Sequence, residues 1–253
     1  MKKKSVYHIG LMVIMLLGAG RGFAGTFGGA EFGYNQYDNF NGATGSTAKL
    51  EENVSSTTLY LGNFSPRSKR SAFVLKGSVV LNKLAKTTQL NNNIFGLNVG
   101  HYYRFNKRNS ISTRLGMRAK RFKDTNRDGE VYSLSVGLKQ KTSKTLWFRQ
   151  GLLIEHGEAE TSSGVYDGVG VNASVNMKLT KGTVVNAGLS WIQRVYDVAT
   201  ADVRTGKSLI LGLTQKLGKS VYIRVSAQAQ ENSANDGSSY RNNVLGLAAG
   251  LSF

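Results

Sequence analysis

Cysteine is absent from the 253 residues, so no disulfide can stabilise the chain and no lipidated cysteine can anchor it. Proline occurs once. That scarcity suits a protein built from hydrogen-bonded strands, because a proline cannot donate to a β-ladder. After residue 25 no run of about 18 consecutive apolar residues occurs, so the sequence offers no transmembrane helix there. These absences exclude a disulfide scaffold and a helical membrane protein.

Groups that perform catalysis or bind metals are also scarce. Only two histidines, His101 and His156, follow residue 25, and no cysteine–histidine cluster suggests zinc. Some barrel enzymes use a histidine and a serine near the outer rim, and His156 beside Glu155 could occupy such a position. No motif, however, fixes a serine, a histidine and an acid together. The stretch DTNRDGE at 124–130 lacks the distal glutamate of a calcium loop, so we interpret it as a turn. We therefore expect no enzyme, no metal and no cofactor.

Acidic residues are few: 15 aspartates and glutamates stand against 33 lysines and arginines, and the formal net charge is +18. A charge of that size and sign raises the question of nucleic acid. The basic residues alternate along strand-like segments, however, and leave no basic helix or recognition motif. The sequence therefore predicts no nucleic-acid partner.

The first 24 residues have the pattern of a secretory signal peptide. Three lysines precede an apolar run over residues 9–17, and Gly22 and Ala24 have the spacing of a signal-peptidase site. The apolar run is too short for a permanent transmembrane helix, although an N-terminal anchor is the alternative. Cleavage after Ala24 would leave residues 25–253 as the mature domain. Its charge would be +14, four less than +18, because three lysines and Arg21 are removed.

Apolar and polar residues alternate with period two beyond residue 25. In residues 109–122, for example, Leu115 and Met117 fall on one face of a strand, while Arg114 and Arg118 fall on the other. Most such segments hold ten or more residues, which matches the roughly 9–11 of a tilted membrane strand and exceeds the roughly 5–6 of ordinary strands. Twelve segments occur, at residues 27–37, 53–63, 71–83, 93–105, 109–123, 130–141, 145–156, 165–179, 183–197, 205–217, 219–231 and 239–253.

The connections between the segments alternate in length. Outer-membrane barrels have short periplasmic turns, longer outer loops and an even number of strands. The sequence therefore predicts an all-β fold, a transmembrane antiparallel up-and-down β-barrel of about 12 strands. A periplasmic sandwich or β-helix is the alternative, but it has no need of alternating connection lengths. The short turns lie around 65–70 and at 106–108, 142–144, 181–182 and 218; the longer connections are 38–52, 84–92, 124–129, 157–164, 198–204 and 232–238.

Period two assigns each strand residue to the lipid or to the lumen. The apolar set should face lipid, with the aromatic residues Tyr132, Trp191 and Phe253 near the interfaces. The polar set is rich in cations, and its acids are Glu31 and, on the same parity, Glu155. Lys76 and Lys141 belong to the inward set as well. The candidate residues for binding an anion or substrate in the lumen are Arg104, Arg114, Arg118, Lys120, Lys139, Arg149, Lys178, Arg194, Lys216 and Arg224.

Four arginines lie mid-strand, where contact with lipid would cost about 2–4 kcal/mol each. Without carboxylate partners they need water or anions, which indicates a hydrated, positively polarised interior that attracts anions. For some of the other cations the alternative is a place at strand ends or beside lipopolysaccharide phosphates. The four mid-strand residues are Arg114, Arg118, Arg149 and Arg224.

The chain ends in NVLGLAAGLSF, residues 243–253, in which larger apolar residues alternate with small ones. We expect this segment to close the barrel against the first strand. A terminal aromatic residue after such alternation resembles the C-terminal signal that the outer-membrane barrel-assembly machinery reads. Leu251 and Phe253 are therefore the candidate assembly signal.

Three stretches of the C-terminal part carry a family likeness: LSWIQRVYD at 189–197, RTGKSLILGLTQKL at 204–217 and SYRNNVLGLAAGLSF at 239–253. Through them residues 90–253 resemble the barrel of the surface lipoprotein assembly modifier family and of related exopolysaccharide-export proteins. These families usually add an N-terminal tetratricopeptide domain, which this sequence lacks, so an export role would need a separate periplasmic or surface-lipoprotein partner. In size, strand count and inward cations the chain also resembles small channels for acidic oligosaccharides.

The sequence thus predicts a conduit with a positively charged lumen in the outer membrane of a Gram-negative bacterium, exported through the Sec pathway. Two transport roles stay open: diffusion of small anionic solutes such as acidic oligosaccharides, and export of a polymer or protein. A pore-less structural or adhesive barrel and a lipid-modifying barrel enzyme are the other classes. The expected contacts are outer-membrane lipid, lipopolysaccharide and the barrel-assembly machinery.

Overall fold

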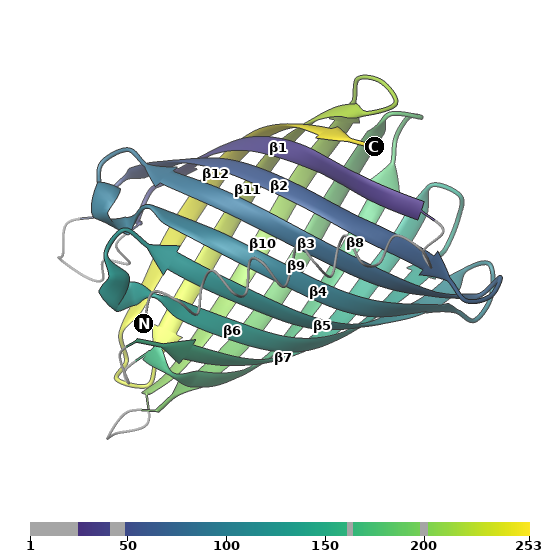
Figure 1. The fold of residues 1–253 in the computed structure, drawn as a ribbon. Helices are drawn as coiled ribbons and strands as arrows, with labels where there is room; N and C mark the ends of the chain where they lie inside the picture. The colour runs from purple at the N-terminus through teal and green to yellow at the C-terminus, as the bar shows by residue number, and fades with distance from the viewer. Residues whose placement is uncertain (1–24, 41–48, 161–163, 198–201) are drawn as a thin grey trace.

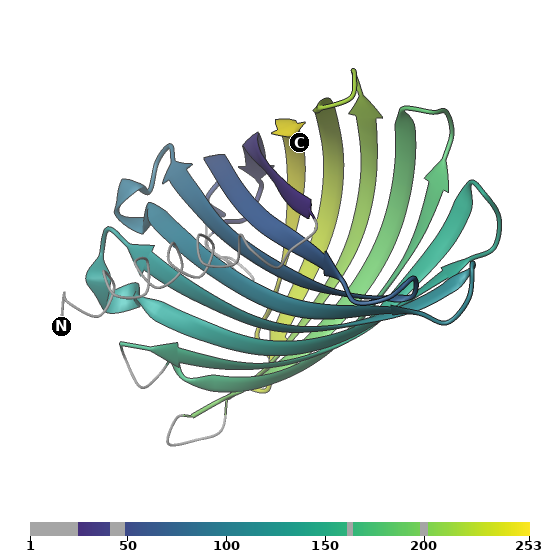
Figure 2. The same ribbon diagram turned by 45° about the vertical axis from the view of Figure 1, so that its right-hand side comes forward.

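The chain folds into a closed antiparallel β-barrel, seen in a computed structural model that describes residues 25–40, 49–160, 164–197 and 202–253. The predicted signal peptide, residues 1–24, lies outside the described residues. Each strand pairs with the next in sequence, and β12 pairs with β1, so the described strands leave no free edge (Figures 1 and 2). This confirms the predicted fold class. The strands are β1 (Gly25–Tyr37), β2 (Glu52–Pro66), β3 (Ser71–Leu84), β4 (Asn92–Arg104), β5 (Asn109–Phe122), β6 (Gly129–Lys141), β7 (Leu146–Ala159), β8 (Tyr166–Lys178), β9 (Thr183–Tyr196), β10 (Asp202–Lys216), β11 (Val221–Ala234) and β12 (Ser239–Ser252).

Most strand ends lie within two residues of the predicted ones, and the larger differences add residues to strands. β2 continues to Pro66, β7 to Ala159 and β11 to Ala234, while β10 already begins at Asp202. Three of these extensions lie at the ends that carry the longer loops, and their residues are mostly polar. The ladder hydrogen bonds continue there after the apolar alternation has stopped, so the sequence pattern underestimates strand length.

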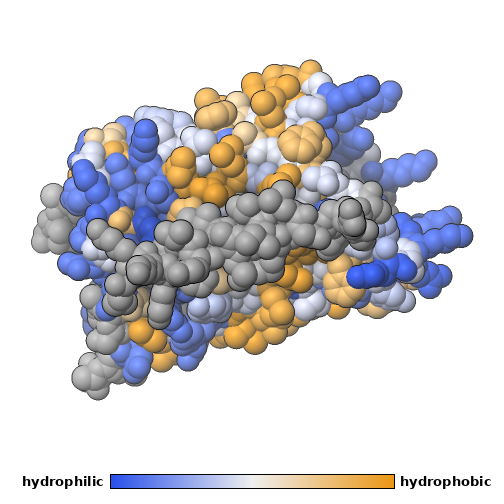
Figure 3. Space-filling view, in the orientation of Figure 1, coloured by the Kyte–Doolittle hydropathy of each residue, from blue (hydrophilic) through white to orange (hydrophobic). Residues whose placement is uncertain are grey.

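The outer face of the barrel is apolar and exposed. Leu115, Leu152 and Leu189 are 60%, 60% and 62% exposed, and Figure 3 shows a belt of hydrophobic residues between two hydrophilic ends. Soluble monomers rarely expose a continuous apolar patch of this kind. Among the described residues the buried hydrophobic side chains are few, namely Val54, Ala72, Leu84, Ala119 and Val244. The outer face is therefore suited to lipid, and burial in a protein core contributes little to this fold.

Five tight turns connect the strands at the end where β1 begins and β12 stops, which we call the turn end (right in Figure 1). Each turn has four residues: 67–70, 105–108, 142–145, 179–182 and 217–220. In four of them the second residue accepts backbone N–H groups through its side-chain oxygen, as Asn106 Oδ1 does from Arg108 and Asn109, both at 2.8 Å. The others are Ser68, Ser143 and Thr180, while the fifth turn has Gly218.

The opposite end, the loop end, carries the connections 38–51, 85–91, 123–128, 160–165, 197–201 and 235–238. The last has only four residues, because β11 extends into the predicted loop. Carboxylates hold the backbone here. Glu52, fully buried at the start of β2, accepts N–H groups of Ala85, Lys86 and Thr87 at 2.8–3.3 Å, beside a short 3₁₀ helix, η2 (Thr88–Leu90).

The predicted turn at 124–130 contains a second 3₁₀ helix, η3 (Thr125–Arg127), capped by Asp124, before the chain enters β6. Neither helix described in the chain is long and apolar enough to cross a membrane.

In the last loop, Gly237 adopts a φ of 84°. Beside it, hydrogen bonds from the Ser238 side chain and backbone lower the pKa of Asp236.

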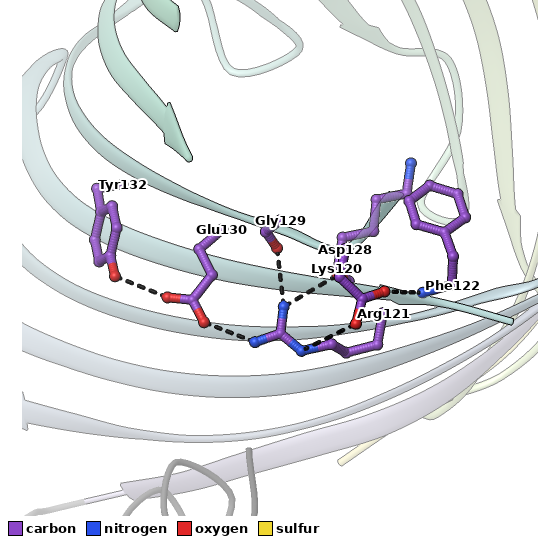
Figure 4. Close-up of polar contacts among 7 residues, drawn as sticks. All are labelled: Lys120, Arg121, Phe122, Asp128, Gly129, Glu130 and Tyr132. Carbon is purple, nitrogen blue, oxygen red and sulfur yellow. Dashed lines mark hydrogen bonds and ion pairs between the residues drawn. The ribbon is translucent and has the colours of Figure 1, made fainter. Parts of the chain in front are cut away.

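Arg121 shows how basic residues are neutralised at the loop end (Figure 4). Its guanidinium lies 2.7 Å from Glu130 and 3.9 Å from Asp128. It also donates to the carbonyls of Lys120 and Gly129 at 3.2 Å. The second oxygen of Glu130 accepts from the Tyr132 hydroxyl at 2.8 Å. This network ties β5, the loop after it and β6 together on the outer face.

Candidate functional site

The strand register places all ten predicted binding residues on the inner face of the barrel. Arg114, for instance, lies opposite Gly100 on β4 and Ser135 on β6, while the neighbouring Leu115 lies opposite Val99 and Leu134, which are exposed on the outer face. Side chains alternate strictly between the two faces of a strand, so the parity of each strand follows from its pairing. The inner face thus carries Arg104, Arg114, Arg118, Lys120, Lys139, Arg149, Lys178, Arg194, Lys216 and Arg224.

A cavity of about 640 Å³ lies on the inner wall between β3 and β8, mostly in the half nearer the turns. None of the described residues that line it is acidic. Small residues make the space: Gly100, Gly137 and Gly151 line it beside polar side chains of Asn98 and Asn172. We call it the cationic cavity, after the four basic residues that line it, Lys76, Arg114, Lys139 and Arg149.

Two of these cations face each other directly. Lys139 on β6 and Arg149 on β7 are register partners, and like charges in opposite positions of a sheet repel. The Lys139 ammonium lies 5.3 Å from the centre of the Trp147 ring, which offsets part of the repulsion. Neither Arg114 nor Arg149 forms an ion pair with an acid of the described residues. Water or anions must therefore balance these charges.

Two of the four mid-strand arginines do have carboxylate partners, so the prediction that all four lack them is wrong for this pair. Arg118 lies 3.7 Å from Glu155, whose side chain is 1% exposed, and Arg194 donates to the other oxygen of Glu155 at 2.8 Å. Arg224 lies 3.3 Å from Glu31, which also accepts from the Tyr222 hydroxyl at 2.6 Å. The alternation along each strand predicted that Glu31 and Glu155 face inward. It could not predict that β1 and β7 bring these acids beside arginines of other strands.

The remaining predicted cations lie near the two rims. Arg104 donates to the carbonyl of Lys69 at 2.7 Å, and Lys178 and Lys216 end their strands at the turns. Lys120 lies near the loop end, with its ammonium 4.5 Å from the centre of the Phe122 ring. The cationic cavity therefore gathers only three of the ten predicted residues, Arg114, Lys139 and Arg149, together with Lys76.

Near the loop end, the inner wall carries a group of two arginines and two tyrosines, of which sequence reasoning predicted only Arg194. Arg204 lies 4.5 Å from the centre of the Tyr196 ring and pairs with Asp202 at 2.7 Å. Arg194 similarly lies over Tyr166, at 5.3 Å. Arg204 was excluded because the predicted strand began at residue 205. The alternation of Asp202, Arg204 and Gly206 continues the strand parity and could have included it.

The two histidines are on the outer face. His156 Nδ1 lies 2.8 Å from Asp167 and its Nε2 lies 3.8 Å from Glu158. Glu155, its sequence neighbour, points to the inner face, so the pairing of His156 with Glu155 that we considered is wrong. Adjacent strand residues face opposite ways. His101 Nε2 lies 2.8 Å from the hydroxyl of Ser71. The described residues contain no group of three or more potential metal ligands.

The last strand closes the barrel as predicted. Phe253 exchanges backbone hydrogen bonds with Gly28 at 3.0 and 3.2 Å, and β12 pairs with β1. Leu251 and Phe253 project from the outer face and are 52% and 75% exposed. Both are thus accessible at the turn end, while their role as an assembly signal stays a prediction.

Solved structures share this fold. An outer-membrane channel from Pseudomonas putida F1 matches with a TM-score of 0.70 at 13% identity, over 92% of this chain and 98% of that one. The KdgM porin in complex with disordered oligogalacturonate matches with a TM-score of 0.52 at 10% identity, over 89% and 99%. The outer-membrane channel DcaP of Acinetobacter baumannii matches with a TM-score of 0.51 at 12% identity, over 90% and 96%.

These comparisons establish the fold, a closed barrel of the type found in outer-membrane channels. No protein-family model and no curated protein sequence matches the chain. The resemblance to the surface lipoprotein assembly modifier family therefore stays a prediction from the sequence.

Proposed function

We propose that this protein is an outer-membrane channel that passes small anionic solutes along a positively charged inner wall. The closed barrel and the exposed apolar belt suit a bilayer, since every strand edge is paired and the outer face needs lipid. The short turns then face the periplasm and the loops face the exterior. The same structural class includes channels, which supports the proposal at the level of the fold.

The observation that carries the proposal is the cationic cavity. Its four basic side chains lie together, and none of the described residues that line it is acidic. A wall with fixed charges of one sign raises the local concentration of counter-ions and repels co-ions. Because Lys139 and Arg149 oppose each other in register, an anion between them relieves a repulsion that the protein itself leaves in place.

Acidic oligosaccharides are the solute class that we favour. Guanidinium groups bind carboxylates in a bidentate manner, and aromatic rings offer a face to sugar rings. Both occur near the loop end, where Arg194 and Arg204 lie over Tyr166 and Tyr196. Each of these arginines also pairs with an acid of the chain, Glu155 or Asp202, so a solute carboxylate there would share the guanidinium with that acid. A solute that enters from the loops would meet this group first and the cationic cavity afterwards. The KdgM porin, which shares the fold, was captured with oligogalacturonate.

The other function classes have less support. Export of a polymer or protein with a periplasmic partner depends on the sequence resemblance, and no contact in the described residues favours it. A lipid-modifying enzyme would need a hydroxyl nucleophile, a histidine and an acid together. Ser71 lies 2.8 Å from His101, but no ion pair joins His101 to an acid of the described residues, and both ion-pair partners of the rim histidine His156 are carboxylates. A pore-less adhesive barrel would have no use for a cavity in which Arg114 and Arg149 have no ion pair with an acid of the described residues. We therefore propose transport without catalysis.

Planar-bilayer recording tests the proposal. In a salt gradient the folded protein should open with a reversal potential that reports anion preference. Arg114→Glu combined with Arg149→Glu should move the preference toward cations. Arg149 is preferred to Arg118 as the second position because Arg118 already pairs with Glu155.

The matched control is Lys83→Glu with Lys207→Glu, which makes the same charge change on the outer face. The control should keep the anion preference of the original protein. Silence of the original protein under all conditions would contradict the channel. An equal shift in both variants would show that the cationic cavity does not set selectivity.

A further inference from the structure

The turns at the turn end carry a set of exposed cations. Their five four-residue segments contain eight lysines and arginines and no aspartate or glutamate. Figure 3 shows hydrophilic side chains projecting from this end of the barrel. The third residue of every turn is a lysine. We call these five residues the turn ring: Lys69, Lys107, Lys144, Lys181 and Lys219, all of them exposed.

The backbone fixes the spacing of the turn ring. In four turns the residue before the lysine holds the turn closed through its own side chain, as Asn106 does before Lys107 and Thr180 does before Lys181. Each lysine therefore leaves its turn at the same point. Because one turn joins each hairpin from β2–β3 to β10–β11, the five ammonium groups are distributed around the circumference of the barrel.

Apolar residues in three of the same turns indicate how deep in the bilayer the turn ring lies. Phe105, Leu179 and Leu217 are the first residues of three turns, and they are 48%, 53% and 61% exposed. Phe253, at the same end, is 75% exposed. Exposed apolar groups of this size are stable where they contact lipid. A lysine two residues further along the turn then lies at the level of the headgroups, with its stem along apolar surface and its ammonium outward.

We propose that the turn ring binds phosphate groups of phospholipids in the inner leaflet and prefers anionic lipids such as phosphatidylglycerol. Each lysine near an anionic membrane surface favours binding by about 1 kcal/mol, which corresponds to roughly fivefold. An acidic periplasmic protein is the other candidate for a basic surface. It would dock on a patch, whereas the five lysines of the turn ring stand one to a turn, and apolar anchors lie in three of the same turns. The other three cations of the turns, Arg67, Arg70 and Arg108, lie in the first two turns.

The proposal rests on the outer-membrane location proposed above, but it does not need the channel to conduct. Its test is native mass spectrometry of the folded barrel, released from detergent with equal amounts of phosphatidylglycerol and phosphatidylcholine that have identical acyl chains. The original protein should carry phosphatidylglycerol in about fivefold excess, the preference expected where one lysine contacts each bound lipid. Replacing all five lysines of the turn ring by glutamine should bring the ratio to within about twofold of unity.

The matched control replaces five exposed lysines of the loop half by glutamine, with the same change in charge: Lys49, Lys83, Lys86, Lys123 and Lys207. This control should keep the phosphatidylglycerol excess. The shift in gel mobility between heated and unheated samples checks that each variant is folded. A further arm adds millimolar glycerol phosphate, which should not displace the lipid.

Three results would overturn the proposal. One is an original protein without lipid preference, which is the result expected if the ring serves an acidic protein. The second is an equal loss in both lysine variants. The third is displacement by glycerol phosphate, which would show a site for a diffusible anion. Failure of the channel proposal alone would appear in the bilayer recordings and leave the lipid ratio unchanged.

Discussion

The two halves of the barrel differ sharply in charge. When each strand is divided at its midpoint, the turn half of residues 25–253 holds 17 lysines and arginines, and the loop half holds 12 together with 14 acids. The one remaining acid, Glu31, lies at the middle of β1. The net positive charge of the protein therefore belongs almost wholly to the turn half, which contains most of the cationic cavity and the turn ring.

Both halves must satisfy backbone N–H groups where the chain reverses, and they do so with different chemistry. In the loop half the acceptors include the carboxylates Glu52, Asp128 and Asp236. In the turn half they are neutral oxygens, such as those of Asn106 and Thr180. The neutral acceptors close the turns without cancelling the nearby cations. Both halves therefore supply acceptors for backbone N–H groups at their chain reversals, although only the turn half carries a net positive charge.

The largest effect is expected from Glu52→Ala, which removes the main carboxylate cap of the loop half. Glu52 is fully buried and accepts four backbone N–H groups and the Thr87 hydroxyl. Leaving several of these donors unsatisfied should lower the free energy of unfolding by about 4 kcal/mol. Urea unfolding in detergent measures the loss. A loss below about 1 kcal/mol would show that water replaces the carboxylate without penalty.

Glu155→Gln should have the next largest effect, because it removes the acid that neutralises Arg118 and Arg194. Discounted for the partial exposure of both arginines, the loss should be about 2 kcal/mol. The two freed cations should also increase anion preference in bilayer recordings, which makes the loop half resemble the turn half. Glu158→Gln on the same strand is the control, since its pairing with His156 is exposed. Equal losses in the two variants would contradict this account.

Sequence pattern predicted the barrel because its rules are local. Alternation along 109–122 already assigned Arg114 inward and Leu115 outward, and pairing then confirmed that parity. The partner of Arg118 could not be predicted in this way. Glu155 reaches it from β7, across β6, and this depends on the tilt and stagger of the strands rather than on spacing along the chain. Arg204 was missed for another reason: its strand continues beyond the apolar alternation that defined it.

Asn106 offers a smaller and more specific test of the turn half. Asn106→Ala removes the side-chain oxygen that accepts from Arg108 and Asn109, and it should cost about 1 kcal/mol. Asn106→Asp keeps that oxygen and should change the unfolding free energy by less than about 0.5 kcal/mol. Such a result would show that folding does not require a neutral acceptor at this position. The neutral side chain would then matter only because it leaves the nearby cations uncancelled. If the aspartate variant loses as much stability as the alanine variant, the comparison between neutral and anionic acceptors fails.

The smallest effect is expected from Lys139→Glu, and it should be a gain. A glutamate opposite Arg149 replaces a like-charged pair by an opposite-charged one, which should raise the unfolding free energy by about 0.5 kcal/mol. The same change should weaken anion preference, because it puts an acid into the cationic cavity. Lys178→Glu, opposite Val184, is the control and should bring no such gain. A stabilised variant with weaker anion preference would show that the turn half gives up stability for its charge. Because the substitution also removes the contact of Lys139 with the Trp147 ring, Lys139→Gln is measured beside it. A glutamate variant less stable than the glutamine variant would mean that charge at position 139 does not interact with Arg149 as proposed.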